Sequence, residues 1–220
     1  SFSVIACAQT NGICGLKPPV GTLPSEGIIP IATTLDSAGT MARNFTDTLK
    51  LYSAMRKEPF PKVEEAKLKG LRIAVNQANE SMVSEGQKKY LSHVLRKLEK
   101  KGVIIEEVTQ NPTPYLKTIM KYEFKVKLEE YLKNATASKK TLAEIVEYYE
   151  AHPETMMKYG DSYLRASLEE TEGGLLSEEY CEAMQVRKEM MKEIINQNAG
   201  YDAVIMTGPT NIMHFCGLPS

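Results

Sequence analysis

The pattern that most constrains the fold lies in residues 70–108, where a buried strand, an amphipathic helix and a second strand follow one another. Residues 71–75 form a run with the length of a strand that is apolar except for Arg72, and a second apolar run begins at Val103. Between the two runs, Ser84 opens a capping-box pattern, and two lysines followed by Gly102 mark the end of a helix. Strands joined by a helix of this length run parallel, which predicts a βαβ unit and an α/β fold.

The part of the chain after this unit is predicted to be mostly helical, in three or four segments, before it returns to a strand. The expected elements are a helix with Met120, Phe124, Leu128 and Leu132 on one face, a helix over 141–149 interrupted near Pro153, a long helix over 178–197, a strand over 201–206 and a loop over 207–210.

The composition excludes several classes of protein. The 220 residues are 42% hydrophobic and 25% charged with a net charge of −1, which is typical of a soluble domain and disfavours nucleic-acid or membrane-surface binding. The longest apolar stretches fall well short of the roughly 20 residues that a transmembrane helix needs. We therefore expect a cytoplasmic protein with no nucleic-acid or membrane partner.

The four cysteines, Cys7, Cys14, Cys181 and Cys216, show no paired spacing and are predicted to be free thiols in a reducing compartment. His214 stands two residues before Cys216, but a zinc site needs four ligands, usually at short paired spacings. We expect no metal or other cofactor.

The first 45 residues are rich in glycine, proline and threonine and carry few charges, which favours tight backbone packing near a site over a solvated helix. A helix capped by Asn44 or Thr46 should follow and run to about Met55, before prolines 59 and 61 interrupt the chain.

Ser3 opens a run that continues through Gly12 to the segment Gly15-Leu16-Lys17-Pro18. Further distinctive segments follow in order: Gly27-Ile28-Ile29-Pro30, Leu35 to Arg43, Tyr201 to Met206, Gly208-Pro209-Thr210 and Gly217-Leu218-Pro219. Together these segments resemble the amidase signature family from one end of the chain to the other.

The resemblance implies a Ser–cis-Ser–Lys hydrolase acting on a small-molecule amide. In such enzymes a serine attacks the carbonyl, a second serine relays its proton to a buried neutral lysine, and backbone N–H groups stabilise the oxyanion. Ser3 takes the nucleophile position. Ser1 is the other candidate, because Ser1 and Phe2 stand where the family has glycines. Lys17 matches a structural lysine of the family rather than the base.

Asp36 and Arg43 stand at positions that look shared across the family. We predict that they form a buried or half-buried polar scaffold under the site, with substrate contact as the alternative. Six methionines of the helical region are predicted to fill the core, with the wall of an apolar acyl pocket as the alternative: Met120, Met156, Met157, Met184, Met190 and Met191.

The resemblance implies an α/β fold in which helices flank a mixed sheet, here a partial amidase-signature core with a helical insert. We expect one incomplete domain in four parts: a nucleophile region (1–60), the βαβ unit (61–110), a helical insert covering the substrate (111–200), and a late core strand and loop (201–220). The lysine and the bridging serine would lie upstream, so the chain is predicted to be a fragment that exposes apolar surface and self-associates. The alternatives to a hydrolase are a catalytically silent fragment and an amidotransferase subunit that works with a partner.

Overall fold

The computed structural model describes residues 2–76, 83–110, 113–206 and 210–220. Ser1 and most of the predicted loop at 207–210 lie outside these ranges. In chain order the elements are α1 (Phe2–Asn11), β1 (Cys14–Leu16), β2 (Thr40–Ala42), α2 (Phe45–Arg56), β3 (Arg72–Asn76), α3 (Glu85–Lys100), β4 (Ile104–Val108), α4 (Leu116–Asn134), α5 (Leu142–Ala151), α6 (Pro153–Met156), α7 (Ser162–Glu169), the short 3-10 turn η2 (Gly174–Leu176), α8 (Glu178–Asn198), β5 (Ala203–Met206) and α9 (Ile212–Phe215).

The predicted βαβ unit is confirmed. At the start of α3, the Ser84 hydroxyl accepts a hydrogen bond from the Gln87 N–H, and the Gln87 side chain bonds back to the Ser84 N–H. The helix ends at Lys100, and Gly102 adopts a φ of +85°, which is the left-handed conformation that glycine tolerates best. These local signals fix both ends of the helix that joins β3 to β4.

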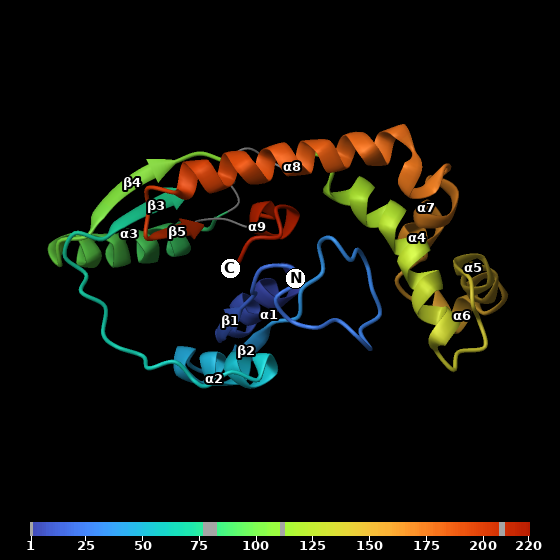
Figure 1. Cartoon of the computed structure of the whole chain (residues 1–220), viewed down its shortest axis with the longest axis horizontal. Helices are drawn as coiled ribbons and strands as arrows, with labels where there is room; N and C mark the ends of the chain where they lie inside the picture. The colour runs from blue at the N-terminus through green and yellow to red at the C-terminus, as the bar shows by residue number, and fades with distance from the viewer. Residues whose placement is uncertain (1, 77–82, 111–112, 207–209) are drawn as a thin grey trace.

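The chain returns to this unit much later and adds a third parallel strand. β4 and β5 pair with opposite sides of β3, so the strand order is β4-β3-β5, with Ile73 of β3 opposite Ala203 of β5. All the helices from α4 to α8 therefore belong to one long crossover between β4 and β5. Figure 1 shows α8 running back from the helical end of the molecule to the sheet.

The nucleophile region forms a second, smaller sheet. β1 and β2 pair antiparallel beside α1 and α2. The α/β class is confirmed, and within the described residues the parallel and antiparallel strands form separate sheets. The predicted tight packing is seen at Gly39, where a Cβ would lie 2.5 Å from the Leu16 carbonyl oxygen. The composition argument against a helix is wrong for residues 2–11, which form α1.

The last residues of the chain are tied to the segment after β1. The Lys17 N–H donates to the Ser220 carbonyl oxygen at 2.6 Å, and the Ser220 N–H donates to the Lys17 carbonyl at 2.8 Å. The Val20 N–H adds a 3.0 Å bond to the Gly217 carbonyl. Segments from opposite ends of the sequence are therefore joined next to α1.

α4 belongs to two hydrophobic clusters. Ile119, in its first half, is buried with residues of α8, α9 and the loop before β2, including Leu35, Met190, Ile194 and Phe215. Phe124, Leu128 and Leu132, in its second half, are buried against α5 and α7. The predicted apolar face of this helix is confirmed, and it connects the core beneath the nucleophile region to the core of the helical end.

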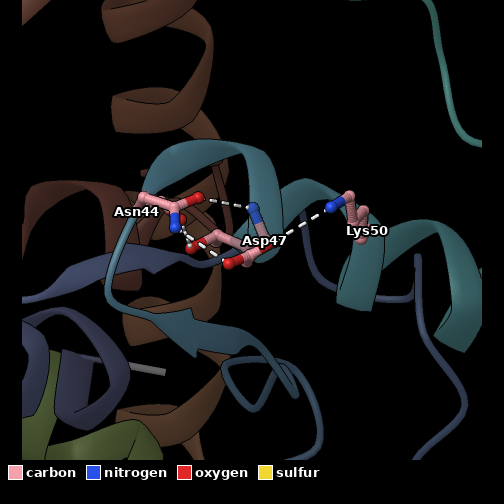
Figure 2. Close-up of polar contacts among 4 residues, drawn as sticks. Asn44, Asp47 and Lys50 are labelled. Atoms are coloured by element: carbon pink, nitrogen blue, oxygen red, sulfur yellow. Dashed lines mark hydrogen bonds and ion pairs between the residues drawn. The ribbon is translucent and has the colours of Figure 1, made fainter.

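The start of α2 shows which predicted cap is used. Figure 2 shows Asn44, Asp47 and Lys50 joined by polar contacts across the first two turns of this helix. The Asn44 Oδ1 accepts from the Asp47 N–H at 2.9 Å, and its Nδ2 donates to the Asp47 carboxylate at 2.8 Å. The hydrogen bond from Asn44 and the bond from Lys50 lower the pKa of Asp47. Asn44, and not Thr46, is therefore the cap.

We expect Asn44→Ala to lower the free energy of unfolding by about 0.5–2 kcal/mol, because the Asp47 N–H loses its acceptor. Urea denaturation measures this change. Thr46→Ala is the matched control, and it should change the same quantity by less than about 0.5 kcal/mol. Equal losses from both variants would contradict the assignment of the cap.

Candidate active site

Ser3 opens onto a cavity of about 650 Å³. Its side chain is exposed in the first turn of α1, and within the described residues it makes no hydrogen bond. The first N–H groups of a helix have no partner inside the helix, and the positive end of the helix dipole stabilises nearby negative charge. The cavity thus has an accessible hydroxyl at its edge, in the first turn of a helix.

The cavity walls come from parts of the chain far apart in sequence. The lining residues belong to α1, the loop before β2, α4, α7 and the segment around α9. The walls are mainly apolar, with Leu35, Leu116, Met120 and Ala166 among the lining residues. Lys121 of α4 and Glu170, just after α7, form an ion pair of 2.6 Å that joins two walls.

Asp36 and Arg43 were predicted to form a scaffold under the site, and only Asp36 fits. The Asp36 Oδ2 accepts hydrogen bonds from the N–H groups of Ile31 (2.8 Å) and Ala32 (3.0 Å), which closes the turn that borders the cavity. Burial raises the pKa of Asp36, and the two backbone bonds oppose that rise. Arg43 is exposed, so the prediction is wrong for it. Arg43 stands at the end of β2, beside the exposed first turn of α2.

A buried carboxylate that the sequence analysis missed holds the same loop to the helices. Glu123 of α4 is only 1% exposed. It accepts hydrogen bonds from the Thr34 N–H, the Thr33 and Thr34 hydroxyls, and the Tyr180 hydroxyl of α8. Burial and the nearby Glu123 charge raise the pKa of Tyr180. The signal was a glutamate beside Phe124 on a face expected to be apolar.

Arg187 of α8 completes this connection. Its guanidinium donates to the Thr34 carbonyl oxygen at 2.8 Å and to the Phe215 carbonyl oxygen at 2.7 Å. The loop before β2 and helix α9, which form two cavity walls, are therefore held by one side chain of the long crossover helix.

His214 and Cys216 lie two residues apart, in and directly after α9. Both are buried, and His214 lines the cavity. Burial lowers the pKa of His214 to about 4 and raises that of Cys216 to about 11, so both are neutral near pH 7. Across the ranges that the structure describes, no three His, Cys, Asp or Glu side chains gather as a metal site would require.

Four of the six methionines predicted to fill the core do so, whereas Met156 and Met157 are half-buried and belong to neither hydrophobic cluster. Met190 is buried in the first cluster, and Met120, Met184 and Met191 pack against it. Met120 also lines the cavity, so for this residue the core and pocket interpretations both hold.

Lys17 is buried to 1% exposure, and its ammonium donates to the Pro18 carbonyl oxygen at 3.1 Å. Burial lowers its pKa to about 8. Lys17 is not among the residues that line the cavity with Ser3, which agrees with the expected structural role.

Comparison with known proteins gives a consistent result. A family model described as Amidase matches residues 3–214. A probable amidase from Arabidopsis thaliana is 25% identical over 242 residues, covering 94% of this chain and 44% of the relative. The mandelamide hydrolase of Pseudomonas putida is 34% identical over 109 residues (50% of this chain, 21% of the relative). A subunit of the glutamyl-tRNA(Gln) amidotransferase of Sulfurisphaera tokodaii is 32% identical over 126 residues (51% and 26%).

The fold is also found among solved structures. The crystal structure of an amidase family protein from Bacillus anthracis superposes with a TM-score of 0.82 at 24% identity, over 100% of this chain and 48% of that one. The chain thus spans less than half the length of these relatives. Among the described residues, no helix combines the length and the apolar character needed to cross a bilayer.

The burial of Lys17 leads to a pH-dependent prediction. Between pH 8 and 10.5 the folded state has lost the Lys17 proton while the unfolded state still holds it, so stability rises with pH in this window. We expect Lys17→Met to raise the free energy of unfolding by on the order of 1–3 kcal/mol relative to the wild type below pH 8. This difference should disappear by pH 10.5. Denaturant titrations at several pH values measure this. Lys188→Met, at an exposed position of α8, should show no such crossover; a Lys17→Met difference independent of pH would contradict the assignment.

Proposed function

Because this chain belongs to the amidase family, we propose that the polypeptide containing it hydrolyses the C–N bond of a carboxylic amide, with Ser3 as the nucleophile. The observation that carries the proposal is the exposed Ser3 hydroxyl, at the start of α1 and on the edge of a mainly apolar cavity. The family match begins at this residue.

The proposed reaction has two stages. The Ser3 Oγ attacks the amide carbonyl, its proton passes through a base to the leaving nitrogen, and the amine departs to leave an acyl ester on Ser3. Water then attacks the ester, releasing the carboxylic acid and returning the proton to Ser3. N–H groups at the start of α1 stabilise the oxyanion in both stages. The resemblance to Ser–cis-Ser–Lys hydrolases supports a lysine and a second serine outside residues 1–220 as the proton relay.

The substrate is proposed to be a small amide with a largely apolar acyl group. A cavity of about 650 Å³ falls within the usual size of small-molecule sites. The relative named for mandelamide, an amide with a compact aryl acyl group, supports the same substrate class. Four free thiols, Cys7, Cys14, Cys181 and Cys216, support a reducing, cytoplasmic setting.

A fluorophosphonate probe tests the proposed nucleophile. We expect the full-length polypeptide that contains this chain to be labelled at Ser3, as located by peptide mass spectrometry. Ser3→Ala should abolish labelling and reduce amide hydrolysis by about 10³-fold or more. Ser92→Ala, at an exposed position of α3, is the control. Loss of labelling in Ser1→Ala with retention in Ser3→Ala would transfer the role to Ser1. Equally fast labelling of residues 1–220 alone would contradict a base outside this chain.

A second candidate function is that of one component of an amidotransferase, which the similarity to the glutamyl-tRNA(Gln) amidotransferase of Sulfurisphaera tokodaii supports. Formation of the same acyl-enzyme would then release ammonia from an amide donor, and the ammonia would be transferred to an acceptor held by a partner. We expect such a component to co-purify with partner chains and to consume glutamine faster when the acceptor is present. Purification as a single species with no acceptor dependence would exclude this candidate.

A further inference from the structure

Asn211 is one of the residues that line the same cavity as Ser3. It lies directly before α9, is partly exposed, and lines the cavity together with His214. An asparagine amide offers two N–H donors and a carbonyl acceptor. In the part of the chain that the structure describes, no hydrogen bond uses this side chain. These groups are therefore available to a molecule in the cavity.

The local structure explains why the Asn211 side chain makes no capping hydrogen bond. Asparagine is one of the strongest helix N-caps, yet Asn211 stands at the cap position of α9 without capping it. The hydroxyl of Thr210 instead accepts the Ile212 N–H at 3.2 Å. The backbone carbonyl of Asn211 still accepts the Phe215 N–H at 2.7 Å, so the main chain is fixed while the amide is left for other use.

The position of Asn211 is held from outside the cavity. Ile212 and Phe215, which follow it on α9, are both buried in the first hydrophobic cluster. Arg187 binds the Phe215 carbonyl oxygen at 2.7 Å. The backbone that carries Asn211 is therefore already fixed, and only the side-chain torsions of Asn211 need to be ordered when it binds a ligand.

The charges around the cavity indicate what kind of group this amide would meet. Lys121 and Glu170 neutralise each other in their ion pair, and His214 is uncharged near pH 7. Lys117 of α4 also lines the cavity, but it is exposed, so solvent and salt screen its charge. The Asp36 carboxylate is bound by two backbone N–H groups and would repel an anion. A neutral group that can both donate and accept hydrogen bonds fits this environment better than a carboxylate.

We propose that Asn211 determines substrate specificity: its amide binds a neutral hydroxyl or carboxamide substituent on an otherwise apolar acyl group, and so selects amides that carry such a substituent. This inference rests on the proposed function, because it names the substrate class of the same cavity. The apolar walls from α4 and α7 hold the body of the acyl group, and Asn211 fixes its orientation relative to Ser3.

A matched pair of amides tests the inference without requiring turnover. 2-Hydroxy-3-phenylpropanamide and 3-phenylpropanamide differ only in one hydroxyl group. Calorimetric titration of the full-length polypeptide carrying Ser3→Ala gives the Kd of each amide. We expect the hydroxy amide to bind at least tenfold more tightly, and adding Asn211→Leu should reduce this ratio to about one. Asn211→Gln, which keeps an amide, should retain part of the preference.

Asn196→Leu makes the same substitution at an exposed position of α8 and should leave the ratio unchanged. An unchanged ratio in folded Asn211→Leu, with only a lowered melting temperature, would show that Asn211 is structural and overturn the inference. Equal binding of the two amides, or binding of neither, by the Ser3→Ala protein would also overturn it. If Asn211 governs binding but the protein with Ser3 intact hydrolyses neither amide, the inference stands and the proposed function fails.

Discussion

The buried carboxylate of Glu123 is the contact on which the arrangement of the cavity depends. It binds the loop that carries Thr33 and Thr34 to α4, and through the Tyr180 hydroxyl it also holds α8. An unpaired charge at this depth would be strongly destabilising, so Glu123 requires all of these partners to be present together. Arg187 extends the same connection to α9. These hydrogen bonds join the helices of the crossover to the nucleophile region.

Short-range chemistry explains what could be predicted from the sequence. The ends of α3 depend on Ser84, Gln87 and Gly102, which act within one helical turn, and the parallel pairing of β3 and β4 follows from the helix between them. The position of β5 beside β3 was not predicted, because the apolar pattern of a strand does not indicate which strand it pairs with. The small β1–β2 sheet was missed because its strands are only three residues long.

The residues of the candidate site also fall into those that could be predicted from the sequence and those that could not. Ser3 could be named from the family-like run that it opens, and Asp36 from a segment of the same kind. Glu123 and Asn211 reach the site only through tertiary contacts. Glu123 lies on a helix face that was expected to be apolar, and Asn211 precedes a helix too short to be recognised from the sequence. Arg43 illustrates the opposite case, since a position that looks shared within a family need not be buried.

The long crossover has a consequence for how the protein is made. The Arg72 N–H donates to the Asp202 carboxylate across 130 residues of sequence, and β5 can join β3 only after every helix of the crossover has left the ribosome. Contacts of such separation slow folding and leave the free edge of β3 open to other chains in the meantime. Synthesis of this region is therefore the stage at which a chaperone that shields strand edges would have the most effect.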